Sequence, residues 1–139
     1  MATGQSLSRG TASHICEIPF RLPGLNEYIA VCRANRFAGA EFKRKWHRNI
    51  FPYLSSLQRA QNVVRIHFTW YEPNHRRDVD NVAFGKKFIL DAMVERGILK
   101  DDSPKYVCGF TDEFRYGEEK VVIEIEEVHN EEITKRADT

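Results

Sequence analysis

Residues 62–73, NVVRIHFTWYEP, constrain the fold more than any other part of the chain. Their apolar positions, Val64, Ile66, Phe68 and Trp70, alternate with polar or surface-tolerant residues. A period of two is typical of a β-strand with one buried face. Pro73 ends the strand because proline has no N–H group to donate to a neighbouring strand. The chain therefore should contain a sheet with this strand in it.

Three further segments read as strands. HICEIPF, at 14–20, alternates apolar and polar residues before a turn. The runs at 105–116 and 120–128 are joined by the short link GEE, which suits a β-hairpin.

Two segments have helical spacing. One long helix follows Asn26, a suitable N-cap, and either continues through 37–39 or breaks there before it closes near Pro52. The second spans 82–95, with Asp80 or Asn81 as the N-cap and Gly97 as the stop. The order β-α-β-α-β-β predicts a small mixed α/β domain, with helices packed on a mixed sheet.

The length of 139 residues fits one domain, which we expect over 14–128, between a disordered segment (1–13) and a polar tail (129–139). No stretch approaches the roughly 20 apolar residues that span a bilayer, and the start lacks the apolar core of a signal peptide. We expect a soluble, cytoplasmic protein without a membrane partner. The three cysteines form no C-x-x-C pair, so buried small hydrophobes are the expectation for them.

The net charge of +1 hides an uneven distribution. Basic residues gather between 33 and 59, and glutamates gather after 117. Candidate DNA contacts in the basic segment are Lys43, Arg44, Lys45 and Arg48, weighed evenly against the solvated side of a core-packed helix. The aromatic residues Phe37, Trp46 and Phe51 are expected in the core.

The acids of RRDVDN raise the question of function. In an extended segment Asp78 and Asp80 project to one side, where two like charges require a positive partner. Arg76, Arg77 or a divalent cation could be that partner, and the pairing with arginine is the better interpretation for an isolated motif. Asp80 could also cap the helix. The position between a strand and a helix favours a functional site, because a rigid scaffold presents the side chains there.

Further acids follow the same helix. Lys87 and Asp91 are neighbours by i, i+4 spacing, where an exposed ion pair is the alternative to a functional role. Asp101 and Asp102 lie in KDDSP, which is also ordinary turn chemistry. The calcium-loop, phosphate-loop, zinc and serine-nucleophile patterns are absent from the sequence, so carboxylates would have to carry any reaction.

RRDVDN, the lysine, LDAM and GILKDDSP resemble, in that order, the motifs of the RusA family of Holliday-junction resolvases, many of them carried by phages and prophages. The resemblance covers about residues 60 to 128. It implies an Mg²⁺-binding triad of Asp78, Asp80 and Asp102, for which Mn²⁺ could substitute.

The resemblance also implies that Lys87 is the essential lysine beside the scissile phosphate. The segment between Asp80 and this lysine is longer than in the family pattern, so Lys86 competes for the role. Asp91 and Asp101 become supporting acids, and Arg76 and Arg77 join the basic residues as candidate DNA contacts.

The expected function is therefore an Mg²⁺-dependent, structure-selective endonuclease that resolves Holliday junctions by paired symmetric nicks, acting as a homodimer on branched DNA in recombination and repair. Two alternatives stay open. One is a nuclease for other branched DNA, such as forks or flaps. The other is a catalytically idle DNA-binding protein of the same fold.

Overall fold

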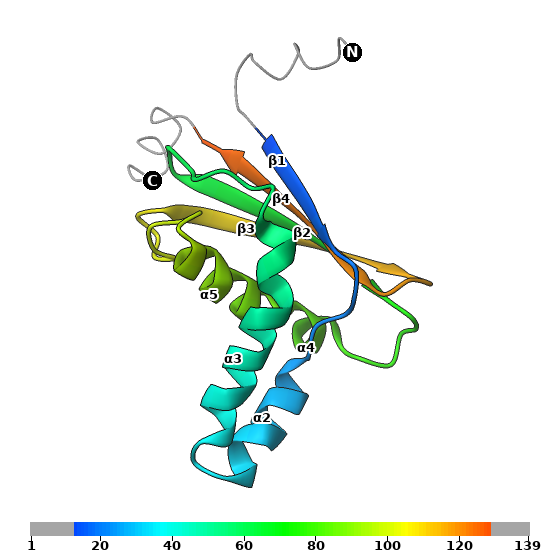
Figure 1. Cartoon of the computed structure of the whole chain (residues 1–139). Coiled ribbons are helices and arrows are strands. Elements are labelled where there is room, and N and C mark those ends of the chain that lie inside the picture. The colour runs from blue at the N-terminus through cyan, green and yellow to red at the C-terminus, as the bar shows by residue number, and fades with distance from the viewer. Residues whose placement is uncertain (1–12, 129–139) are drawn as a thin grey trace.

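Four strands form one mixed sheet in the computed structural model, which describes residues 13–128 (Figure 1). They are β1 (Ser13–Ile18), β2 (Val64–Glu72), β3 (Val107–Tyr116) and β4 (Lys120–Glu127). The order is β1-β4-β2-β3, with β4 antiparallel to both neighbours and β3 parallel to β2. The predicted mixed α/β domain is confirmed. The expected disordered segment and polar tail lie outside the described residues, except that Ser13 already belongs to β1.

The predicted hairpin between the last two strands is wrong, because β2 lies between β3 and β4. The short link passes the end of β2, where the Gly117 N–H donates to the Glu72 carbonyl oxygen at 2.9 Å. Gly117 has φ 104°, a left-handed conformation that glycine adopts without strain. Strand β4 belongs beside β2 because its apolar positions continue the buried face of that strand.

The predicted long helix is two helices, α2 (Leu25–Ala34) and α3 (Ala38–Ile50), followed by the 3₁₀ turn η1 (Phe51–Leu54). The break lies at 35–37, where the Asn35 side chain accepts a hydrogen bond from the Phe37 N–H at 2.9 Å. Gly24, and not Asn26, occupies the N-cap position of α2. Figure 1 shows the two helices as a hairpin that projects from one side of the sheet.

The connection from β2 to β3 contains α4 (Val79–Ala83) and α5 (Lys86–Arg96), where one helix was predicted. The chain breaks at Gly85, where a Cβ atom would lie 3.1 Å from both Leu22 Cβ and Trp70 Cζ3. Gly97 ends α5 with φ 87°, as predicted. The N-cap position of α4 belongs to Asp78 rather than to Asp80 or Asn81.

The core lies between the sheet and the helices. Strand β2 contributes Val64, Ile66, Phe68 and Trp70, all buried as predicted. Ile123 and Ile125 of β4 and Ile89 and Met93 of α5 complete its centre. Within the described residues, no helix has the length and apolar character needed to cross a membrane.

The expected burial of Phe37 and of Cys32 is wrong. Phe37 is 70% exposed, because it stands in the link between α2 and α3 at the far end of their hairpin. Trp46 and Phe51 are partly buried. Cys16 is in the core, whereas Cys32 is exposed on α2.

Candidate carboxylate and lysine site

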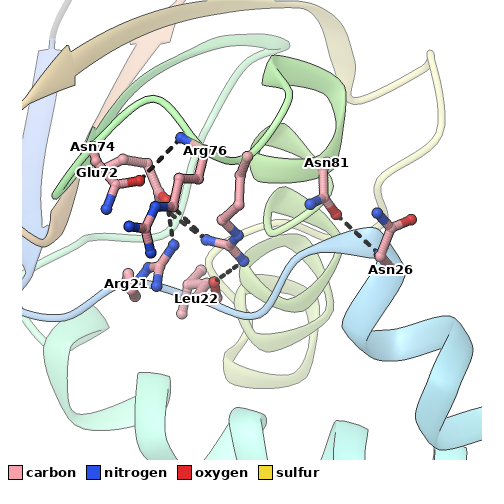
Figure 2. A network of polar contacts seen from close by, with 8 residues as sticks. Arg21, Leu22, Asn26, Glu72, Asn74, Arg76 and Asn81 are labelled. Carbon is pink, nitrogen blue, oxygen red and sulfur yellow. Dashed lines mark hydrogen bonds and ion pairs between the residues drawn. The ribbon is translucent and has the colours of Figure 1, made fainter.

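The loop that carries Asp78 and Asp80 is fixed to the body of the protein at both ends (Figure 2). Before the acids, Arg77 donates through Nη1 to both oxygens of Glu72, at 3.1 and 3.0 Å, and through Nη2 to the Leu22 carbonyl oxygen at 3.0 Å. After the acids, Asn81 Oδ1 accepts a hydrogen bond from the Asn26 backbone N–H at 2.9 Å. The arginine and the asparagine of the motif therefore act as anchors.

Glu72 is the centre of the first anchor. It is 4% exposed and is the one buried charged residue in the described part of the chain. Arg21 Nη2 also donates to it, at 2.5 Å. A buried carboxylate is tolerated when it is paired and hydrogen-bonded, and Glu72 has two arginine partners.

Gly24 makes the second anchor possible. A Cβ atom at this position would lie 2.5 Å from Asn81 Oδ1 and 2.8 Å from Arg77 Nη2. A larger residue here would push the Asn81 and Arg77 side chains out of their anchoring positions. The turn before α2 and the acidic loop are thus packed as one unit.

Asp78 and Asp80 form no ion pair with any described residue. Asp80 Oδ1 accepts a hydrogen bond from the Asn81 backbone N–H at 3.0 Å, and the Asp78 side chain makes no capping hydrogen bond. The alternative in which the two arginines neutralise these aspartates is therefore wrong for Arg77, which pairs with Glu72. Arg76 is exposed, and only its backbone N–H has a hydrogen-bond partner among the described residues, Asn74 Oδ1 at 3.0 Å.

Asp80 lines an open hollow of about 570 Å³ together with Lys86, Lys87 and Asp112. Its remaining walls are apolar, with Phe84 and Leu90 from the helical side and Phe114 from β3. Asp78 immediately precedes this hollow on the loop. The hollow therefore collects two carboxylates and two lysines from α4, α5 and β3.

Lys86 is the lysine whose side chain is fixed by several contacts. Its Nζ lies 2.8 Å from Asp112 Oδ2, and it stands over the rings of Phe110 and Phe68 with 4.6 and 5.3 Å to their centroids. Trp70 Nε1 donates to the other oxygen of Asp112 at 2.8 Å. Two contacts thus orient the Asp112 carboxylate, and the cation is fixed beside aromatic faces.

Lys87 is more exposed and pairs with Asp91 at 3.3 Å, as the i, i+4 spacing predicted. The side chains of Lys86 and Lys87 are 19% and 45% exposed. Both lysines line the hollow, so both stay candidates for the essential lysine. The tighter packing distinguishes Lys86.

Asp112 was not predicted from the sequence. It pairs in register with Phe68. Phe110 and Phe114, two residues to either side of it on β3, point to the same face of the sheet, so Asp112 stands at a position where an apolar residue is expected. A charged residue in the middle of such an alternation is the signal that could have identified it. It joins the site because β3 is parallel to β2 and lies beside the helical crossover.

Asp102 does not join the other acids within one chain. It precedes the start of β3, whereas Asp78 and Asp80 follow the end of the parallel strand β2. Helix α5, of 11 residues and about 16 Å, lies between them. Across residues 13–128, no three His, Cys, Asp or Glu side chains form a group that could hold a metal ion. The three acids therefore do not converge within one chain, and their expected convergence in a dimer stays a prediction.

Asp101 is exposed next to Asp102 and belongs to the same end of the molecule. Asp91 lies on α5 beside the basic helix, in a hollow of about 370 Å³ that Lys43, Arg44 and Arg48 also line. Neither acid lines the hollow of Asp80.

Helix α3 presents its basic residues outward while Phe42 and Trp46 pack against the core. Arg44 and Lys45 are exposed, and the hydrogen bond from Arg44 Nη2 to Glu41 at 2.7 Å lowers the pKa of the Glu41 carboxyl. Lys43 and Lys45 stand over the rings of Tyr28 and Trp46. The solvated side of a core-packed helix is confirmed for Arg44, Lys45 and Arg48, and the DNA contact stays a prediction.

No protein-family model matches the chain, and no curated protein sequence matches it. The description of the site therefore rests on the contacts of its own residues.

Proposed function

We propose that the chain is an Mg²⁺-dependent endonuclease that resolves Holliday junctions by paired symmetric nicks. The observation that carries the proposal is the pair of unpaired aspartates, Asp78 and Asp80, held on a doubly anchored loop. Unpaired carboxylates on a fixed scaffold leave their oxygens available for a ligand of opposite charge. The ordered resemblance to RusA-family motifs supports the same function.

The donor set of the hollow fits a hard divalent cation. Asp80 and Asp112 line it, and Trp70 and Lys86 fix the Asp112 carboxylate. Mg²⁺ is usually held by one or two carboxylates, with water and substrate phosphate completing its coordination. A group of three acids is therefore not required. In this proposal Asp78 and Asp80 hold Mg²⁺ or Mn²⁺, while the Asp112 carboxylate stays bound to Lys86 and Trp70.

The chain itself would supply orientation and charge. When bound, the cation would polarise a phosphodiester and activate water for in-line attack. Lys86 or Lys87 would direct a fixed positive charge at the phosphate oxygens as negative charge develops on them. The apolar wall of Phe84, Leu90 and Phe114 would limit the water around that charge.

A homodimer would complete the proposed site. Strand β3 is an edge of the described sheet, and edge strands can pair with a second chain. If two β3 strands paired antiparallel about a two-fold axis, the start of one would meet the end of the other. Asp102 of the partner subunit would then approach the end of the sheet that carries Asp78 and Asp80.

The separation of Asp102 from the other acids within one chain also favours a second candidate, a DNA-binding protein of this fold without cleavage activity. Both candidates use the outward basic residues of α3, because Lys and Arg side chains bind phosphates with a salt-dependent affinity. The two differ only in whether a strand is cut.

The test is cleavage of a synthetic four-way junction with Mg²⁺ by the wild type, Asp80→Asn and the matched surface control Glu119→Gln. We expect paired symmetric nicks from the wild type and the control, and a loss of about 10²-fold or more for Asp80→Asn. Junction binding without cleavage by any of the three would establish the second candidate instead. Equal cutting of flaps or linear duplex would change the substrate from junctions to other branched DNA.

A further inference from the structure

A second hollow, of about 490 Å³, is lined in part by the start of the anchored loop. Its lining includes Arg21, Arg76, Arg77, Asn74 and Trp46. Figure 2 shows Arg21, Asn74 and Arg76 close to Glu72 at this place. Because Arg77 directly precedes Asp78, the hollow and the acidic site share one loop. The first site uses none of these side chains except the anchor Arg77.

Two donors among these residues have no acceptor. Arg21 Nε and Trp46 Nε1 are buried atoms without a hydrogen-bond partner among the described residues. The guanidinium and indole N–H groups can only donate, so a hydrogen-bond partner for either of them must be an acceptor. A buried donor without an acceptor costs free energy, which a bound oxygen would recover.

The charge around the hollow favours an anionic oxygen. Glu72 does not line the hollow, but it binds Arg77 and one nitrogen of Arg21. Glu27 lines the space, so three arginines face two glutamates and leave one positive charge in excess. The Arg76 guanidinium is exposed and makes no ion pair with a described residue, which leaves its fork of donors available.

We propose that this hollow binds the phosphate group of a nucleic-acid strand that continues into the acidic site. Planar guanidinium groups bind phosphate through paired N–H···O bonds. The Arg21 Nε and Trp46 Nε1 groups, which lack acceptors, belong to side chains that line the hollow. The binding of a phosphate group is inferred from the residues of this hollow alone. The source of that phosphate, a DNA backbone, rests on the proposed function.

The two tryptophans provide the readout. In ¹H–¹⁵N spectra each gives one indole signal, and Trp70 Nε1 already donates to Asp112, so its signal serves as the internal reference. A Trp46→Phe variant assigns the signals. Titration with inorganic phosphate should move the Trp46 signal and leave that of Trp70 in place. A short single-stranded oligonucleotide should also move the Trp46 signal.

Arg76→Ala is the test variant, because its exposed side chain makes no contact that the fold requires. We expect its affinity for both probes to fall by about tenfold. Arg33→Ala removes the same charge from the end of α2, outside the lining of this hollow, and should bind both probes as the wild type does. An unmoved Trp46 signal with both probes, or equal losses in the two variants, would overturn the proposal.

The remaining outcomes separate this proposal from the proposed function. If inorganic phosphate moves the Trp46 signal and the oligonucleotide does not, the hollow takes free phosphate and the nucleic-acid part is wrong. If both probes bind while the four-way junction stays uncut with Mg²⁺, the hollow stands and the endonuclease fails.

Discussion

Arg77 holds both carboxylate oxygens of Glu72 with a single nitrogen, Nη1, at 3.1 and 3.0 Å. This pair joins the end of β2 to the loop that carries the two candidate catalytic acids. Since the Arg77 side chain is only 17% exposed, neither water nor salt can readily replace its partner. The position of the acids therefore depends on a buried ion pair.

Glu72→Gln should destabilise the fold strongly. The change leaves the buried Arg77 charge without compensation, and we expect the free energy of unfolding to fall by about 3 kcal/mol. Urea denaturation monitored by circular dichroism measures it. The matched control is Glu113→Gln, which breaks an exposed pair with Arg115 and should cost less than about 1 kcal/mol. Equal losses would mean that the buried pair contributes no more than the exposed one.

Asp78→Asn and Asp80→Asn should leave stability almost unchanged. Neither carboxylate has an ion-pair partner among the described residues, so we expect changes within about 0.5 kcal/mol. Both variants should nevertheless lose Mg²⁺ binding in isothermal titration calorimetry. A large loss of stability would instead assign the acids a structural role.

Lys86→Met should reduce junction cleavage more than Lys87→Met does. Lys86 is fixed between Asp112 and two aromatic rings, whereas Lys87 forms an exposed pair with Asp91. A positioned cation contributes about 10²–10³-fold to the rate, which single-turnover cleavage would show. Thermal unfolding of both variants checks that the loss is not one of folding. The larger loss in Lys87→Met would support the assignment from motif spacing.

Mixing two inactive variants tests whether Asp102 acts across a dimer. If Asp102 of the partner subunit completes each site, a heterodimer of Asp80→Asn and Asp102→Asn contains one intact site and one doubly altered site. The mixture should then nick one strand of the junction, although each variant alone is inactive. If all three acids of a site came from one chain, every site would stay damaged and the mixture would remain inactive.

The cysteines predict a pH dependence. Burial raises the pKa of the Cys16 thiol to about 11, from an ordinary value of 9.0. The folded state thus retains its proton more tightly than the unfolded state, so the stability contribution is complete below pH 9 and is lost as pH rises towards 11. Thiol labelling at pH 8 should modify the exposed Cys32 quickly and Cys16 only on unfolding. Fast labelling of both would contradict the burial of Cys16.

The sequence predicted the strands and helices better than it predicted which strands pair with each other. The alternation of β2 and the stop at Gly97 were read correctly, because local period and backbone conformation determine them. The hairpin failed because pairing depends on which apolar faces meet, and β4 matches β2 better than β3 does. A short link allows a hairpin but does not require one.

The candidate site was predicted in part. The sequence pointed to the loop of Asp78 and Asp80 and to the adjacent lysines as candidates. It did not predict the anchors, because Arg21, Leu22 and Asn26 lie far in sequence from the residues they bind. Asp112 was missed because its role depends on the parallel pairing of β3 with β2. Asp102 was placed with the other acids by motif order, which carries no information about the direction of the crossover.

The sheet order has a consequence for synthesis. Strand β4, the last described element, lies between β1 and β2, and it is the neighbour of β1 in the described sheet. Strand β1, the first described strand, must therefore wait for β4, and Ile18 and Cys16 have no sheet neighbour until then. Contacts so distant in sequence form slowly and late. The described domain should complete its core only after β4 has been translated, and a fragment that ends before Lys120 should fail to fold.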